Sequence, residues 1–168
     1  GVSLLSDAAA KRAAKAIDAL RRGWPVRFAD VRGALTLVAI ETGAIGDGDA
    51  VAGLLLSSAR AATLKLANQF SAADVQLPVR IAPPSDLDAT LALAIADPSL
   101  DLRYPYKGPF AAQPLEQPQA ALAAMELARE AGLLPAFLIV DAQAEMDVSA
   151  ADIAAFQDAN GLRIAARA

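Results

Sequence analysis

Short apolar segments alternate with helical segments along the chain, and this order constrains the fold more than any other feature of the sequence. Six segments of five to eight residues read as strands. They are residues 25–29, 34–41, 51–58, 75–82, 135–141 and 162–166. Because helical segments separate most of them, the pattern predicts a single α+β (α/β-like) domain of 168 residues, with one mixed β-sheet and surrounding helices.

Five further segments carry the apolar spacing and the end signals of helices. They are residues 6–24, 58–68, 85–97, 118–134 and 149–162. Gly23 and Gly132 are expected to end the first and the fourth helix, and Ser57 or Ser58 to cap the second. Gly161 is expected to end the fifth helix, immediately before the last strand.

Residues 27–41, RFADVRGALTLVAIE, are predicted to form a hairpin. Its second strand is apolar almost throughout, which favours a central place in the sheet over an edge. Asp30 and Arg32 are interpreted as a tight-turn pair, while Arg27 and Glu41 are the other charged candidates. The hairpin therefore raises the question of whether it contributes to a site or only to a core.

Histidine and cysteine are both absent from the sequence. Disulfides, thiolate metal sites, cysteine nucleophiles and histidine bases are thereby excluded from this chain. Any catalysis would rest on carboxylates, Lys, Tyr or Ser, and binding of Mg²⁺ or Ca²⁺ through oxygen ligands stays open. No dinucleotide, Walker, nucleophile-elbow or zinc-protease motif is present.

The overall charge and hydropathy limit the partners that are expected. A net charge of −4 and a pI near 4.8 argue against nucleic acid. No apolar run approaches the roughly 18 residues of a membrane span, and the first residues do not form a signal peptide. A soluble, cytoplasmic domain is the expectation.

The proline-rich loop 97–117 places aromatic rings beside cations. Arg103, Tyr104 and Lys107 are the candidate residues for binding an anion or a sugar phosphate, with Phe110 close by. The alternative is that the aromatic rings fix the loop to the core and the cations are solvated. The second interpretation is favoured.

Two groups of carboxylates are candidates for acid–base chemistry. Asp47 lies near Asp49, and Asp141 lies near Glu145 and Asp147. A paired-carboxylate site needs convergence in space, which sequence does not show. Solvated charges at the ends of strands and helices are the alternative, and the Asp47 group lacks most of the pattern of a calcium loop.

Several stretches together resemble 3,4-dihydroxy-2-butanone 4-phosphate synthase, an enzyme family of riboflavin biosynthesis. They are AIDALRRGWPVRF with ALTLVAIE, ELAREAGLLPAFLIVD, and ADIAAFQDANGLRI, at residues 16–28, 34–41, 126–141 and 151–164. The resemblance covers the opening helix and hairpin, a later helix–strand pair, and the C-terminal helix and strand. It implies the fold of that family and a homodimer.

The sequence departs from this family where the chemistry is expected. The family has a long acidic segment in the hairpin turn, where this chain has only Asp30–Gly33 and no Glu. By the same resemblance, Ala120 stands where a metal-binding His is expected, and Ala121 and Leu122 replace the following Thr and Glu. The magnesium site of the family is therefore not expected to assemble.

A degenerate domain of this kind resembles the N-terminal part of some bacterial GTP cyclohydrolase II proteins. Their zinc domain uses cysteine ligands, so residues 1–168, which contain no cysteine, are expected to be an N-terminal fragment without that activity. The expected function is a non-catalytic accessory domain that scaffolds, dimerises or regulates the cyclohydrolase and holds no cofactor. A phosphate-ligand binding module, or a divergent synthase acting on ribulose 5-phosphate, is the alternative.

Overall fold

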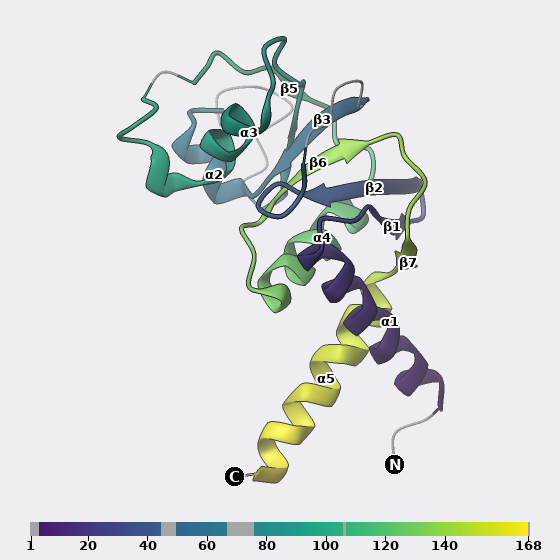
Figure 1. Cartoon of the computed structure of the whole chain (residues 1–168). Helices are drawn as coiled ribbons and strands as arrows, with labels where there is room; N and C mark the ends of the chain where they lie inside the picture. Colours follow the sequence, from purple (N-terminus) through teal and green to yellow (C-terminus); the bar gives the residue numbers. More distant parts are fainter. Residues whose placement is uncertain (1–3, 45–49, 67–75, 106, 168) are drawn as a thin grey trace.

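The structure is a computed structural model that describes residues 4–44, 50–66, 76–105 and 107–167, without the side chains beyond residue 161. Within these residues, seven strands form one mixed sheet in the order β5-β4-β3-β6-β2-β1-β7. Helices cover both faces of the sheet (Figure 1). The predicted α+β domain with one mixed sheet is confirmed.

The sheet is antiparallel except at one edge. Its strands are β1 (Val26–Asp30), β2 (Gly33–Ala39), β3 (Val51–Leu56), β4 (Val79–Ile81), β5 (Ala112–Gln113), β6 (Ala136–Val140) and β7 (Met146–Val148). The predicted hairpin pairs β1 with β2 from Val26 opposite Leu37 to Asp30 opposite Gly33. β2 lies between β1 and β6, as its apolar composition predicted, and only the β1–β7 pair is parallel.

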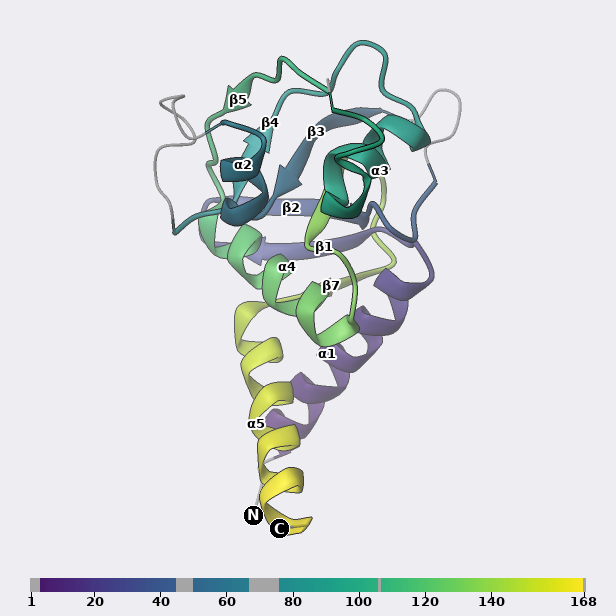
Figure 2. The same cartoon turned by 90° about the vertical axis from the view of Figure 1, so that its left-hand side faces the viewer.

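The helices form two layers, each over its own hydrophobic core. They are α1 (Leu4–Arg21), α2 (Ser58–Thr63), α3 (Ala89–Ala96), α4 (Pro118–Ala131) and α5 (Ala150–Arg167), with a 3₁₀ turn, η2 (Pro98–Leu100). α1, α4 and the start of α5 cover one face, while α2 and α3 cover the other (Figure 2). Because strand side chains alternate between faces, Phe137 joins the first core and Leu138 the second.

The local end signals act where they were predicted. Gly23 has a φ of +76°, and a Cβ at this position would lie 2.5 Å from the carbonyl oxygen of Thr42. Gly132 ends α4 in the left-handed conformation, and the Ser57 hydroxyl accepts a hydrogen bond from the Arg60 amide at the start of α2.

Two sequence predictions about strands are wrong, and one further strand lies where no element was predicted. Residues 162–166 are not a strand, because α5 continues through Gly161 to Arg167. A Cβ at Gly161 would meet open space, and the helix accommodates the glycine without ending there. The loop 97–117 contains the short edge strand β5, and the polar stretch after β6 contains β7. Both strands are too short and too polar for a period-two pattern, and pairing with β4 and β1 forms them.

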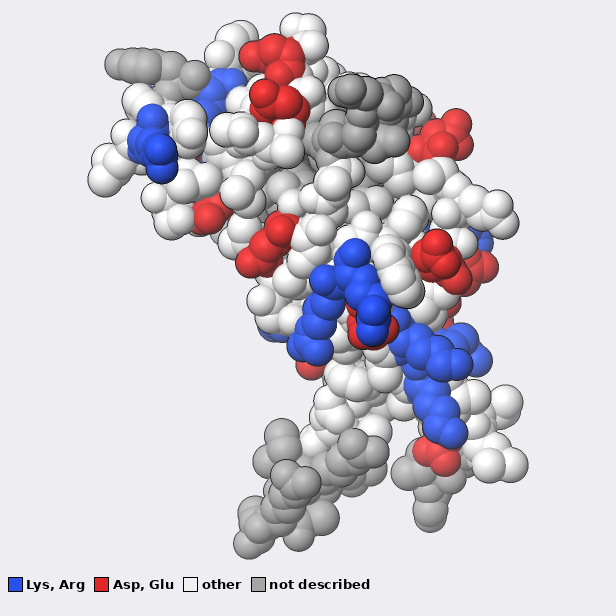
Figure 3. Space-filling model, viewed as in Figure 1, with Lys and Arg blue, Asp and Glu red and all other residues white. Residues whose placement is uncertain are grey.

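α1 and α5 run away from the sheet and diverge toward the two termini (Figure 1). Lys and Arg side chains gather over α1 in the space-filling view (Figure 3). Two of these cations are paired, Arg12 with Asp152 at 3.0 Å and Arg22 with Asp18 at 2.9 Å. None of the described helices is both long enough and apolar enough to cross a membrane.

Candidate functional site

A buried arginine joins three segments on the α2–α3 face of the sheet. Arg60 lies in α2, and its side chain is only 5% exposed. Its Nη1 and Nη2 atoms donate to the two carboxylate oxygens of Asp101 at 2.8 and 2.7 Å. Its Nε and Nη2 atoms also donate to the carbonyl oxygens of Ile95 and Ala94, in the last turn of α3. Arg60 thus satisfies carbonyls that have no partner within the helix.

A second buried cation shares the same carboxylate. The Lys107 side chain is 6% exposed, and its Nζ lies 2.9 Å from Asp101 Oδ1. The ammonium also donates to the backbone carbonyl of Tyr104. Hydrogen bonds from Arg60 and Lys107 outweigh the effect of burial and hold the pKa of the Asp101 carboxyl far below its ordinary value. Asp101 is therefore ionised, and it faces two cations.

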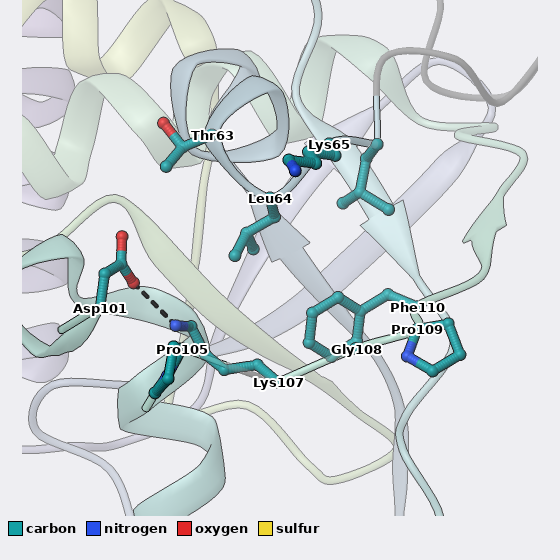
Figure 4. A pocket seen from close by; sticks show the side chains of 10 residues that line it. Thr63, Leu64, Lys65, Asp101, Pro105, Lys107, Gly108, Pro109 and Phe110 are labelled. Carbon is teal, nitrogen blue, oxygen red and sulfur yellow. Dashed lines mark ion pairs between the residues drawn. The ribbon is translucent and has the colours of Figure 1, made fainter. Parts of the chain in front are cut away.

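Asp101 and Lys107 of this cluster line a pocket of about 560 Å³, with Arg60 packed behind Asp101. The pocket lies between residues 63–66, at the end of α2, and a second segment formed by Pro105 and residues 107–110. In Figure 4, Lys107 points at Asp101, while the Phe110 ring and the Leu64 side chain face the hollow. The volume lies within the range of roughly 300–1,000 Å³ that small-molecule sites occupy.

Lys65 lies at the rim of this pocket in a conformation that is unusual for lysine. Its φ is +63°, in the left-handed region, at the position after the C-cap residue Leu64 where helices commonly carry glycine. This conformation costs a residue with a Cβ about 1–2 kcal/mol. This left-handed residue follows α2, which ends at Thr63 and not at residue 68 as the sequence predicted. It also brings a cation to the rim.

The predicted ligand-binding residues Arg103, Tyr104 and Lys107 come together, but on a neighbouring pocket of about 430 Å³. Asp86 and Asp88 line this second pocket as well, so its charges are balanced. The Arg103 guanidinium lies 5.9 Å from the centre of the Tyr104 ring, which is typical of a cation–π contact. Lys107 lines both pockets.

The hairpin turn meets the start of α4, on the other face of the sheet. Asp30 accepts hydrogen bonds from the Arg32 amide through Oδ1 and from the Ala120 amide through Oδ2, both at 2.9 Å. Gln117, the N-cap residue of α4, makes no side-chain capping bond, so Asp30 acts as a cap from a distant part of the chain. Burial raises the pKa of Asp30, but these backbone hydrogen bonds outweigh it and leave the pKa lowered.

This arrangement does not fit the magnesium site that the family resemblance implies. The Asp30 carboxylate is engaged by backbone amides, and Ala120 and Ala121 are fully buried in the α4 core. Among the residues that the structure describes, no group of three or more acidic, His or Cys side chains is placed to hold a metal ion.

The remaining charged candidates have separate surroundings. Glu41 accepts a hydrogen bond from the Leu134 amide at 2.8 Å. Arg27 lies 3.6 Å from Asp147 in an exposed pair across the β1–β7 edge. Asp141 and Glu145 are exposed, and the pair Asp47 and Asp49 lies outside the described residues.

Sequence reasoning missed Arg60, Asp101 and Lys65. Arg60 resembles any polar residue of an amphipathic helix, and its partner Asp101 lies 41 positions away. For Lys65, a lysine in place of the usual glycine gives no local signal of a left-handed residue. Neither a protein-family model nor a curated protein matches this chain.

Proposed function

We propose that this chain is a non-catalytic domain similar to 3,4-dihydroxy-2-butanone 4-phosphate synthase, which scaffolds, dimerises or regulates a cytoplasmic GTP cyclohydrolase II of riboflavin biosynthesis. One observation carries the proposal: the turn of the β1–β2 hairpin contacts the N-terminus of α4 through Asp30 and Ala120. The resemblance implies an active site at this junction.

The chemistry of the junction supports a structural role. A carboxylate that accepts two backbone hydrogen bonds at 2.9 Å is a stable cap and a poor ligand for a hard cation. The buried methyl groups of Ala120 and Ala121 supply neither metal ligands nor acid–base groups. The junction therefore has a packing role, in which Asp30 caps the N-terminus of α4.

The direct test is a formate assay with ribulose 5-phosphate and Mg²⁺. The purified chain is expected to release no more formate than a blank without protein. Turnover well above that blank would refute the proposal and would favour a divergent synthase that works through carboxylates. An Asp30→Asn variant serves as the control, because any activity from this junction should change with it.

The scaffolding part of the proposal needs separate measurements. Sedimentation equilibrium at micromolar concentration is expected to show a homodimer. The full-length reading frame of the gene is expected to encode a cyclohydrolase domain with cysteine ligands for zinc. A monomer from a gene without such a domain would contradict both the dimerising and the scaffolding role.

A further inference from the structure

Among the described residues, the pocket beside α2 has more cations than carboxylates around it. Arg60 and Lys107 are both more than nine-tenths buried, and both pair with the single carboxylate of Asp101. Lys65 adds a further cation at the rim. A buried cation is costly without a counter-charge, so this wall of the pocket is electrostatically complementary to an anion.

The neighbouring pocket does not share this property. There Arg103 and Lys107 face Asp86 and Asp88, and the Asp88 carboxylate also caps α3. Two cations against two carboxylates leave no net charge to attract an anion. The comparison favours the pocket of Lys65 over the one lined by Arg103 and Tyr104.

Lys107 also has hydrogen-bonding capacity to spare. An ammonium group has three N–H donors. Within the described part of the chain, two of them are directed at Asp101 Oδ1 and at the Tyr104 carbonyl. The third N–H is engaged by neither of these two acceptors, and the Lys107 side chain lines the pocket. Lys65, which is exposed, can approach the same acceptor from the rim.

We propose that the pocket between residues 63–66 on one side, and Pro105 and residues 107–110 on the other, binds a small organic phosphate monoester. The phosphate would lie between Lys65 and Lys107, and the organic part would pack against Leu64, Pro109 and Phe110. A phosphate oxygen accepts hydrogen bonds from ammonium groups, and apolar and aromatic walls suit the remainder of such a ligand.

The backbone of Lys65 supports this assignment independently of charge. A glycine at this position would remove the left-handed strain and keep the end of α2 intact. Strained residues cluster at binding sites, so the φ of +63° at Lys65 points to a function for its side chain. The site is separate from the Asp30 junction, so the test of phosphate binding does not depend on the proposed function.

Calorimetric titration of the whole chain with three probes tests the proposal at low ionic strength. Inorganic phosphate reports the anion site, phenyl phosphate adds an apolar ring, and phenol has the ring alone. Phenyl phosphate is expected to bind saturably and more tightly than phosphate. Phenol is not expected to bind saturably. Lys65→Ala is expected to weaken phenyl phosphate binding about five- to tenfold, as for the loss of one screened ion pair.

Two further variants separate this site from its alternatives. Lys107→Gln is expected to weaken binding at least as much as Lys65→Ala, and Arg103→Ala, in the neighbouring pocket, is expected to leave it unchanged. If Lys107→Gln fails to fold, the exposed Lys65 decides alone. No saturable binding, equal binding of phenol, or an effect of Arg103→Ala as large as that of Lys65→Ala would each overturn the proposal.

Discussion

Replacing Lys65 by glycine is expected to stabilise the protein while it weakens the phosphate site. The left-handed conformation at φ +63° costs a residue with a Cβ about 1–2 kcal/mol. Glycine avoids that penalty but loses about 0.5–1 kcal/mol more conformational entropy on folding. The difference predicts a gain of about 0.5–1 kcal/mol in the free energy of unfolding.

The assays are urea and thermal unfolding followed by circular dichroism, with Lys65→Ala as the matched control. Alanine removes the same charge and the same long side chain but keeps the Cβ, so it keeps the strain. In a domain of this size, the glycine variant should melt about 1–4 °C above the alanine variant. If glycine is no more stable than alanine, the left-handed strain at residue 65 is not real and its use as an argument for function fails.

Three further perturbations test other parts of the structure. Asp101→Asn leaves Arg60 buried without its counter-charge and is expected to lower the free energy of unfolding in urea by about 2–3 kcal/mol at neutral pH. The pKa of Asp101 is lowered by folding, so its stabilisation is full above the ordinary value of 3.8 and is lost as the pH falls below it. The difference between wild type and Asp101→Asn should therefore shrink in acid, and a constant difference would contradict the ion cluster. Asp30→Ala removes the acceptor for the Ala120 amide and is expected to cost about 1–2 kcal/mol, with faster hydrogen exchange of that amide; unchanged exchange would show that Asp30 is no cap. Gly23→Ala forces a Cβ against a backbone carbonyl at positive φ and is expected to lower the melting temperature by several degrees, about 2 kcal/mol or more, whereas an unchanged melting curve would refute the close approach.

The parts of the fold that could be predicted depend on residues close together in the sequence. Gly23 and Gly132 end helices because of their own backbone freedom, and the apolar run of β2 is central because both of its faces are buried. The strand β7 could not be predicted, because its few residues are ordered by pairing with β1. The predicted end of α5 at Gly161 is wrong, because the helix continues through this glycine to Arg167.

The candidate site shows the same division. The sequence pointed to Lys107 through its aromatic and cationic neighbourhood, and the structure does place Lys107 on a pocket. Arg103 and Tyr104 line the adjacent hollow, which Lys107 also lines. Arg60 and Asp101 were out of reach, since their pairing depends on how α2, α3 and the loop pack together.

The alternation of Phe137 and Leu138 between two cores has a consequence for how this protein can change over time. Substitutions on the α2–α3 face alter one core, while those beneath α1 and α4 alter the other. Sites that share no partners contribute almost additively to stability. One face can therefore acquire or lose a ligand pocket through successive mutations while the opposite face, with its Asp30-capped helix, keeps the domain folded.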